Sequence, residues 1–256
     1  MQNQIVFYCA TIEKITGKVW WKAGNYMDIR KKRKTAVCWS SGKDCSLALY
    51  RLMKDNEEIV CLVSMVSSKD ERNHAHGIKL KILKYQAEAL GLPLVLIDSE
   101  GNYEASLVAA LKGLKAELGI EQVAFGSLYA KEDRKWNEEI SHKAGVEPIF
   151  PAWISPEDSN ELMQEFLSLG FTAYICRASS EHFDQTCPGR ILDFQFYEEI
   201  RQKAICVMGE AGEYHTFVTD GPIFNKRIEL LKSGVVMNSG LWSLDIQDCR
   251  LIAKNE

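Results

Sequence analysis

The sequence predicts an α/β protein in which a parallel sheet flanked by helices is joined to a smaller α+β part. Two observations support this prediction. From Thr35 to Phe125, short apolar runs alternate with segments of helical spacing, which is the pattern of a parallel sheet with helices on both faces. Past Asp133 this alternation loosens, and the tail from Val235 to Ile252 alternates and turns like β-structure.

The elements of the first part follow in order. Residues 1–34 are expected to form an N-terminal extension with a short strand near residues 4–10. The run at 59–65 is almost continuously apolar, which is typical of a strand buried on both faces. The other predicted elements are strands at 35–39, 94–97 and 122–125 and helices at 45–54, 78–90 and 103–118, the last two closed by a following glycine.

The second part is less regular. We place the boundary after residue 130, which gives units at 35–130 and 131–256. The predicted elements are helices at 134–144 and 159–169, an extended segment at 148–151 and a strand at 172–176. Ligands of open parallel sheets bind beyond the carboxyl ends of the strands, so the turns at 40–46, 66–77 and 126–134 are the candidate site.

The composition limits the classes of function. Hydrophobic residues make up 46% of the 256 residues, and the net charge is −4, from 31 basic and 35 acidic residues. This balance argues against a broad nucleic-acid-binding surface. No apolar stretch is long enough for a membrane span, and no signal peptide is evident. The eight cysteines include no Cys-x-x-Cys pair, so we expect a reduced, cytoplasmic protein.

The most informative segment is the turn at 40–46, Ser-Ser-Gly-Lys-Asp-Cys-Ser. A strand, a loop of small residues and a helix N-terminus form a phosphate site, because the first helical amides lack internal partners and the dipole is positive there. Lys43 adds a cation, and Asp44 can hold a metal ion that bridges phosphates. Asp44 and Ser46 can also cap the helix. A serine-rich turn with a helix cap is the structural alternative.

The loop resembles the SGGxDS pyrophosphate loop of the N-type ATP pyrophosphatases, with Ser41 in place of a Gly and Cys45 in place of a Ser. Three further segments, in the same order, resemble the diphthine–ammonia ligase family over roughly residues 35–230. They are His-Gly-Ile at 76–78 with the run at 85–93, the stretch from Ala-Phe-Gly-Ser at 124–127 to Pro-Ala-Trp at 151–153, and GEAGEYHTFVTDGPIF at 209–224. The last is the most specific, since the family carries GE-x-GE-[FY]-[EH]-T before D-[AG]-P-[LIM]-F.

The resemblance implies a sheet of the adenine nucleotide α-hydrolase (HUP-like) type and an AMP-forming amide ligation. ATP activates a carboxylate as an acyl-adenylate and releases pyrophosphate, and ammonia then displaces AMP. In the eukaryotic branch the carboxylate belongs to diphthine, a modified histidine of elongation factor 2, whereas this sequence is more similar to short prokaryotic members with unsettled substrates. The implied cofactors are ATP and Mg²⁺. The implied partners are ammonium and a carboxylate acceptor, either a small molecule or a modified protein side chain, and a homodimer is left open.

The resemblance also implies the site residues. Lys43 and Asp44 are expected to be catalytic, with Lys43 neutralising phosphate charge and Asp44 binding the metal. The expected nucleotide-binding residues are Ser40, Ser41, Gly42, Lys43, Asp44, Cys45, Ser46, His76, Gly77 and Gly126. A thiol at a helix N-terminus can have a lowered pKa, although a passive small residue is the favoured interpretation of Cys45. An exposed loop histidine followed by a helix-entry glycine is nearly as good an interpretation of His76 and Gly77.

Glu210 and Glu213 complete the expected catalytic set. Two carboxylates in a glycine-rich turn can bind Mg²⁺, position ammonium or act as the general base that deprotonates it, and a solvated acidic turn is the alternative. The expected acceptor-binding residues are Arg190, Asp193, His215 and Thr216, with a buried structural role equally open for His215. Ser127 stands where relatives usually have Asp, which puts in doubt a metal or amine contact there.

Two other functions stay open at this point. An ATP-dependent enzyme that modifies tRNA would use a related fold, but the acidic net charge and the absence of a paired-cysteine element argue against it. A regulator that binds ATP or AMP without catalysis is left open by the departures at Ser41, Cys45 and Ser127.

Overall fold

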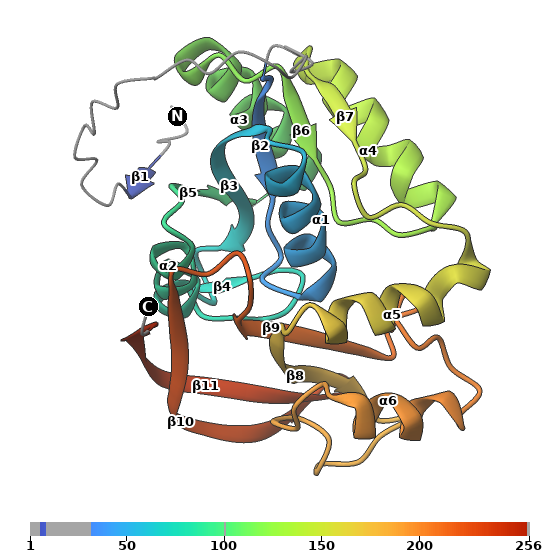
Figure 1. The fold of residues 1–256 in the computed structure, drawn as a ribbon. Coiled ribbons are helices and arrows are strands. Elements are labelled where there is room, and N and C mark those ends of the chain that lie inside the picture. Colours follow the sequence, from blue (N-terminus) through green and yellow to red (C-terminus); the bar gives the residue numbers. More distant parts are fainter. Residues whose placement is uncertain (1–5, 9–31, 100, 255–256) are drawn as a thin grey trace, which may run out of the picture.

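The computed structural model describes residues 6–8, 32–99 and 101–254, which form two sheets (Figure 1). The first is mostly parallel with helices on both faces, and the second is a four-stranded antiparallel sheet. This confirms the predicted fold class. In Figure 1 the first sheet occupies the upper part of the molecule and the second sheet the lower part, with the helices α5 (Ser159–Ser168) and α6 (Phe194–Arg201) beside it.

The first sheet has its topological switch at the central strand, β2. Its order is β1 (Val6–Tyr8), β5 (Leu94–Asp98), β3 (Glu58–Ser67), β2 (Lys34–Cys38), β6 (Gln122–Ala124) and β7 (Glu147–Ile149), with β4 (Arg72–Asn73) paired to the end of β3. β5, β3, β2, β6 and β7 are parallel, and β1 is antiparallel to β5. After β2 the chain adds β3 and β5 on one side of this strand and then β6 and β7 on the other side. A crevice is expected where the chain changes sides, at the ends of β2, β3 and β6.

Four helices cover this sheet. They are α1 (Lys43–Lys54), α2 (Leu80–Leu90), α3 (Tyr103–Leu118) and α4 (Lys131–Ala144). α1 and α2 pack on one face, where Leu47 and Leu83 lie in one apolar core, and α3 and α4 pack on the other, where Leu111 and Ile140 lie in a second core. Glycines in the left-handed conformation end α2, α3 and α4, as expected of a residue without a Cβ.

The second sheet has the order β10 (Lys226–Asn238), β11 (Leu241–Ala253), β8 (Thr172–Ser179) and β9 (Tyr214–Asp220). A short 3₁₀ turn (Pro156–Asp158) precedes α5 (Ser159–Ser168), and α6 (Phe194–Arg201) follows β8. The core beneath α1 and α2 continues into this sheet, since Phe217 and Phe196 belong to the same buried cluster. The two sheets are therefore joined by one continuous apolar core.

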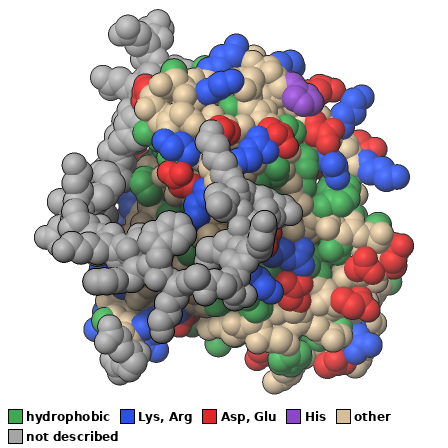
Figure 2. Space-filling view, turned by 45° about the horizontal axis from the view of Figure 1, so that its top comes forward, with side chains coloured by type: hydrophobic (Ala, Val, Ile, Leu, Met, Phe, Trp, Pro, Cys, Tyr) green, Lys and Arg blue, Asp and Glu red, His purple; other side chains and the backbone are tan. Residues whose placement is uncertain are grey.

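Most predicted elements are present with ends shifted by a few residues. The division into 1–34, 35–130 and 131–256 stays a prediction, although β7 pairs with β6 and so extends the first sheet beyond residue 130. Among the described residues, no helix combines the length and the apolar character that a membrane span requires. On the face shown in Figure 2, basic and acidic side chains are intermingled over the described surface.

Candidate nucleotide site

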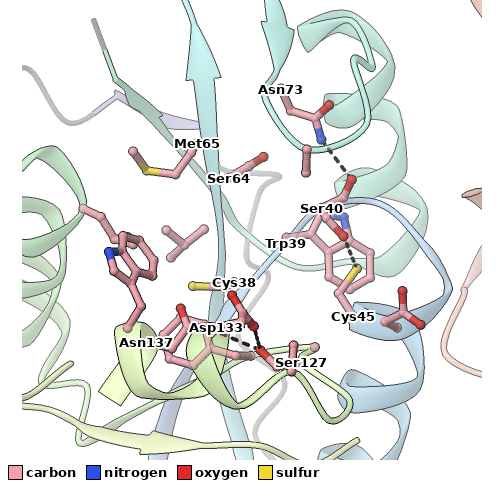
Figure 3. Close-up of a pocket in the computed structure, with 18 of the residues that line it drawn as sticks. Cys38, Trp39, Ser40, Cys45, Ser64, Met65, Asn73, Ser127, Asp133 and Asn137 are labelled. Atoms are coloured by element: carbon pink, nitrogen blue, oxygen red, sulfur yellow. Dashed lines mark hydrogen bonds between the residues drawn. The ribbon is translucent and has the colours of Figure 1, made fainter. Parts of the chain in front are cut away.

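A cavity of about 440 Å³ lies at the switch point, where β2, β3 and β6 end (Figure 3). Its wall combines the loop after β2, the ends of β3 and β6, the first turns of α3 and α4, and Glu210 from the second half of the chain. The lining residues are Cys38, Trp39, Ser40, Asp44, Cys45, Val63, Ser64, Met65, Asn73, Ala75, Tyr103, Leu107, Phe125, Gly126, Ser127, Ala130, Asp133, Trp136, Asn137 and Glu210. This is the place where open α/β sheets bind their ligands.

Gly126 lets the turn after β6 approach the start of α1. A Cβ at this position would lie 2.8 Å from the backbone nitrogen of Cys45 and 3.0 Å from the carbonyl carbon of Asp44. Backbone atoms cannot move aside as a flexible side chain can, so only glycine fits here. The expected contribution of Gly126 to the site is therefore steric: it brings two walls of the cavity together.

The N-terminus of α1 is capped by the second sheet and not by its own side chains. The Lys43 amide donates to the Thr216 hydroxyl at 3.0 Å. The N-cap residue of the helix is Gly42, which has no side chain to accept a capping hydrogen bond. The Ser46 hydroxyl donates to the Gly42 carbonyl oxygen at 2.8 Å, so the expected capping by Asp44 and Ser46 is replaced by a tertiary contact. This contact also explains why the helix begins at Lys43, two residues before the sequence pattern predicted.

Ser41 and Gly42 face the second sheet. Ser41 has φ +82°, is fully buried, and its hydroxyl has no hydrogen-bond partner among the described residues. Its carbonyl oxygen accepts from the Val218 amide at 3.0 Å and from the Gln86 side chain at 3.1 Å. A positive φ is costly for serine, whereas the glycine that the related loop carries at this position can adopt the same backbone conformation without strain.

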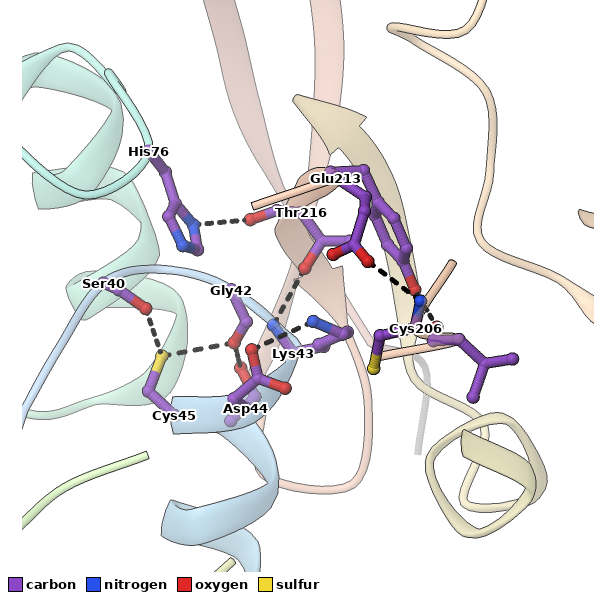
Figure 4. Close-up of polar contacts among 12 residues, drawn as sticks. Ser40, Gly42, Lys43, Asp44, Cys45, His76, Cys206, Glu213 and Thr216 are labelled. Atoms are coloured by element: carbon purple, nitrogen blue, oxygen red, sulfur yellow. Dashed lines mark hydrogen bonds and ion pairs between the residues drawn. The ribbon is translucent and has the colours of Figure 1, made fainter. Parts of the chain in front are cut away.

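Lys43 and Asp44 form an ion pair of 3.0 Å at the start of the helix (Figure 4). The Lys43 side chain is only 3% exposed and its Nζ lies 5.3 Å from the centre of the Tyr214 ring. Asp44 lines the cavity, and its Oδ1 is buried without a hydrogen-bond partner among the described residues. An unpaired buried carboxylate oxygen beside a cavity is suited to a cation, and Mg²⁺ takes one or two carboxylates together with phosphate oxygens and waters.

The Cys45 thiol is a buried group inside the loop. It donates to the Gly42 carbonyl oxygen at 3.2 Å and accepts from the Ser40 hydroxyl at 3.4 Å. Burial raises the pKa of this thiol, and the hydrogen bonds from Ser40 only partly oppose the effect. The helix N-terminus therefore does not make Cys45 a thiolate nucleophile, and the structure favours the passive interpretation of this residue.

Glu210 and Glu213 have different surroundings, although they are three residues apart. Glu210 lines the cavity, and its pKa is raised to about 7, first by burial and then by the nearby charge of Asp44, with Lys43 opposing. Glu213 points into its own turn, where its two oxygens accept from the amides of Cys206 at 2.8 Å and Ala211 at 2.9 Å. Glu210 can thus exchange a proton near neutral pH, while Glu213 holds the turn that presents it.

His76 and His215 lie against each other behind the loop, with ring centres 4.9 Å apart. His76 hydrogen bonds the Thr216 carbonyl oxygen at 2.9 Å, and its ring lies where a Cβ of Gly42 would be. Burial is the main cause that lowers the pKa of His76 well below its usual value and that of His215 to about 4. Both rings are therefore neutral at physiological pH and fill the contact between the two sheets.

Three other expected residues lie away from the cavity. Gly77 is covered by the Arg177 guanidinium, since a Cβ there would lie 2.2 Å from Nη2. Arg190 forms a bidentate ion pair with Glu199 at 2.7 and 2.8 Å and lines a separate cavity of about 400 Å³. Asp193 caps α6 by accepting from the Phe196 amide at 2.8 Å. Their expected roles in binding nucleotide or acceptor stay predictions.

The structure adds residues that sequence reasoning did not select. The Ser64 hydroxyl is buried in the cavity wall without a partner among the described residues, and Asn73 donates to the Ser40 carbonyl oxygen at 2.9 Å. Asp133 hydrogen bonds Ser127, and Asn137 donates to both (Figure 3). An acidic group therefore does stand beside Ser127, supplied by α4. The available signal was position for Asn73 and Asp133, which lie in the segments at 66–77 and 126–134 that were expected at the carboxyl edge of the sheet.

The fold and the cavity at its switch point are those of an α/β protein with a ligand site at the carboxyl edge of its parallel sheet. The chain matches the models of the diphthamide synthase N-terminal domain at residues 33–148 and C-terminal domain at 158–250. It is 26% identical over 228 residues to diphthine–ammonia ligase of Danio rerio, across 78% of this chain and 87% of that protein. The Homo sapiens and Mus musculus proteins of the same name are 25% and 24% identical over 234 and 238 residues, each across 80% of this chain and 86% of the relative. The chain belongs to the diphthamide synthase family.

Proposed function

We propose that this protein is an ATP-dependent carboxylate–ammonia ligase that releases AMP and pyrophosphate, as expected of a relative of the diphthine–ammonia ligases. The observation that carries the proposal is the pairing, in one cavity, of Asp44 at the start of α1, which has an unpartnered carboxylate oxygen among the described residues, with a Glu210 carboxyl whose pKa is about 7. The first suits a triphosphate with a cation, and the second suits an amine that must lose a proton.

In the first half-reaction the acceptor carboxylate attacks the α-phosphorus of ATP, and the bond to the β-phosphate oxygen breaks. Lys43 and the start of α1 would stabilise the charge that develops on the leaving pyrophosphate. Asp44 would hold Mg²⁺, which supplies charge neutralisation on the phosphates. Three acidic side chains line the cavity: Asp44, Asp133 and Glu210. We therefore expect the uncharged part of the nucleotide to contact the aromatic side chains of the wall, Tyr103 and Trp136.

In the second half-reaction ammonia attacks the acyl carbon and AMP leaves. Ammonium is not a nucleophile until it loses a proton, and Glu210 would accept that proton in its ionised form. Burial is the main cause of the raised pKa of Glu210, and the negative charges of Asp44 and Asp133, which add to it, would also attract ammonium. Diphthine, or a related carboxylate on a protein or small molecule, is the proposed acceptor; a cytoplasmic location and a homodimer stay predictions.

The test is product analysis. Purified protein is incubated with ATP, Mg²⁺, ammonium and diphthine-bearing elongation factor 2 or candidate carboxylates, and nucleotides are separated by chromatography. The proposal expects AMP and pyrophosphate in equal amounts, and, without ammonium, pyrophosphate release limited to about one equivalent per active site because the adenylate is retained. Formation of ADP with every acceptor would contradict it.

A further inference from the structure

A third cavity, of about 350 Å³, adjoins the candidate nucleotide site and has two arginines in its wall. It lies between the turn after β3, which includes Arg72 and His74, the Arg177 side chain from β8, and Asn238 at the end of β10. Asn73 lines both cavities and donates to the Ser40 carbonyl oxygen at 2.9 Å. The two cavities are therefore separated only by the width of one loop.

The charges on this wall are unequally compensated. Arg72 is paired with Asp245 at 2.7 Å, and Asp245 also pairs with Lys79 at 2.9 Å. Asp70, the one carboxylate among the lining residues, accepts a hydrogen bond from Ser67 and has no cation within ion-pair distance among the described residues. Arg177 likewise has no carboxylate within ion-pair distance in the part of the chain that the structure describes. Its Nη1 donates to the carbonyl oxygens of His74 at 3.5 Å and Ala75 at 3.3 Å.

Arg177 is half-buried, and burial together with the charge of Arg72 lowers its pKa. Guanidinium remains charged even so, and a desolvated charge is unfavourable unless an anion compensates it. Carbonyl oxygens satisfy two of its donor contacts but carry no net charge. A planar fork of N–H groups with an uncompensated charge at a cavity is the arrangement that binds carboxylate or phosphate.

We propose that this third cavity is an oxyanion site, and that it binds an anionic group that the acceptor carries besides the carboxylate that reacts. The assignment to the acceptor rests on the proposed function and concerns an acceptor with a second anionic group, either a side chain of the protein that bears the reacting carboxylate or a small dicarboxylate. The loop from Asn73 to Ala75 connects the two sites directly, because Asn73 touches the phosphate loop while Ala75 lines the nucleotide cavity and is held by Arg177. An acceptor anchored at Arg177 would extend its reacting carboxylate past this loop toward the α-phosphate.

The experiment titrates inorganic phosphate into the full-length protein by calorimetry, with the nucleotide cavity saturated by Mg²⁺ and α,β-methylene-ATP. Wild type is expected to bind phosphate, and Arg177→Gln to bind it at least about tenfold more weakly. Arg177→Lys keeps the charge but loses the planar fork, so its affinity is expected to lie between the two. Arg201→Gln is the matched control, since Arg201 is an exposed arginine already paired with Glu198 at 2.9 Å. Absence of phosphate binding in wild type, or a folded Arg177→Gln protein that binds as wild type does, would overturn the site.

Two further arms separate the possible failures. In a Lys43→Ala background without nucleotide, phosphate binding that still depends on Arg177 supports the oxyanion site even if no ligase activity is found. In wild type, bound phosphate should slow the modification of Arg177 by phenylglyoxal, which mass spectrometry can map to this residue. Equal rates of modification with and without phosphate would show, without any variant, that phosphate does not bind at Arg177. Competition by acetate and succinate supports an acceptor anion, whereas competition by pyrophosphate alone would overturn that assignment in favour of a product.

Discussion

Replacing Glu210 with Gln should make the protein relatively more stable as the pH rises. The carboxyl has a pKa of about 7 in the folded protein against an ordinary value of 4.5 for an exposed glutamate. A group with a raised folded pKa binds its proton more tightly when folded, so its contribution to stability is present at low pH. That contribution is lost as the pH rises from the unfolded value through the folded one. Glutamine cannot ionise and escapes this loss.

The size of the effect follows from the surroundings of Glu210. A shift from 4.5 to about 7 corresponds, at full weight, to about 3 kcal/mol. Glu210 keeps part of its surface in solvent, where screening weakens electrostatic effects, so we expect about 1 kcal/mol. The variant should match wild type within about 0.5 kcal/mol at pH 5, where protonated Glu and Gln are similar in shape, and exceed it by about 1 kcal/mol at pH 8.

The assay is urea unfolding of both proteins at pH 5, 6, 7 and 8, with the difference in the free energy of unfolding plotted against pH. Taking the difference cancels every other titrating group that the substitution leaves unchanged. The measurement needs neither nucleotide nor acceptor, so it tests the surroundings of Glu210 independently of the ligase proposal. A difference that stays flat, or that falls as the pH rises, would refute the reasoning.

Three further substitutions test the loop. Lys43→Ala should weaken ATP binding, measured by calorimetry, at least about tenfold, because it removes a cation beside the phosphate site; wild-type affinity would remove Lys43 from the site. Ser41→Gly should raise the free energy of unfolding by about 1 kcal/mol, because it removes a serine with a positive φ and a buried hydroxyl that has no partner among the described residues. The greater conformational freedom of glycine in the unfolded chain offsets part of this gain. Destabilisation would contradict this, and Ser40→Gly is the neighbouring control. Gly126→Ala should lower the free energy of unfolding by about 1–3 kcal/mol and weaken ATP binding, because its Cβ would push against the backbone of α1; unchanged unfolding in urea would show that the turn adapts.

The strands and helices of the first sheet could be predicted from the sequence, because hydrophobic periodicity depends only on residues close together along the chain. β3 and α3 are examples, since the apolar run at 59–65 lies within Glu58–Ser67 and the predicted helix at 103–118 matches Tyr103–Leu118. The Ser40–Ser46 loop was likewise located from its local pattern of strand, small residues and helix.

What the sequence could not predict depends on contacts between distant residues. The start of α1 is fixed by Thr216, which lies 173 positions away along the chain. Glu210 and Glu213 share one motif, and only the fold shows that the first faces the cavity while the second binds backbone amides. Asp133 acquires its place beside Ser127 only when α4 packs against the end of β6. Side-chain direction and burial decide each case, and neither is a local property.

The contact between Thr216 and the first turn of α1 makes the two sheets mechanically interdependent. β9 also holds the preceding residues, through the Val218 amide and the Ser41 carbonyl oxygen. A displacement of β9 by a molecule docking on the second half would therefore reach the Ser40–Ser46 turn within two hydrogen bonds, with no intervening hinge. Isolated residues 33–148 would begin α1 without this partner for the Lys43 amide, so the start of that helix depends on a strand from the second half of the chain.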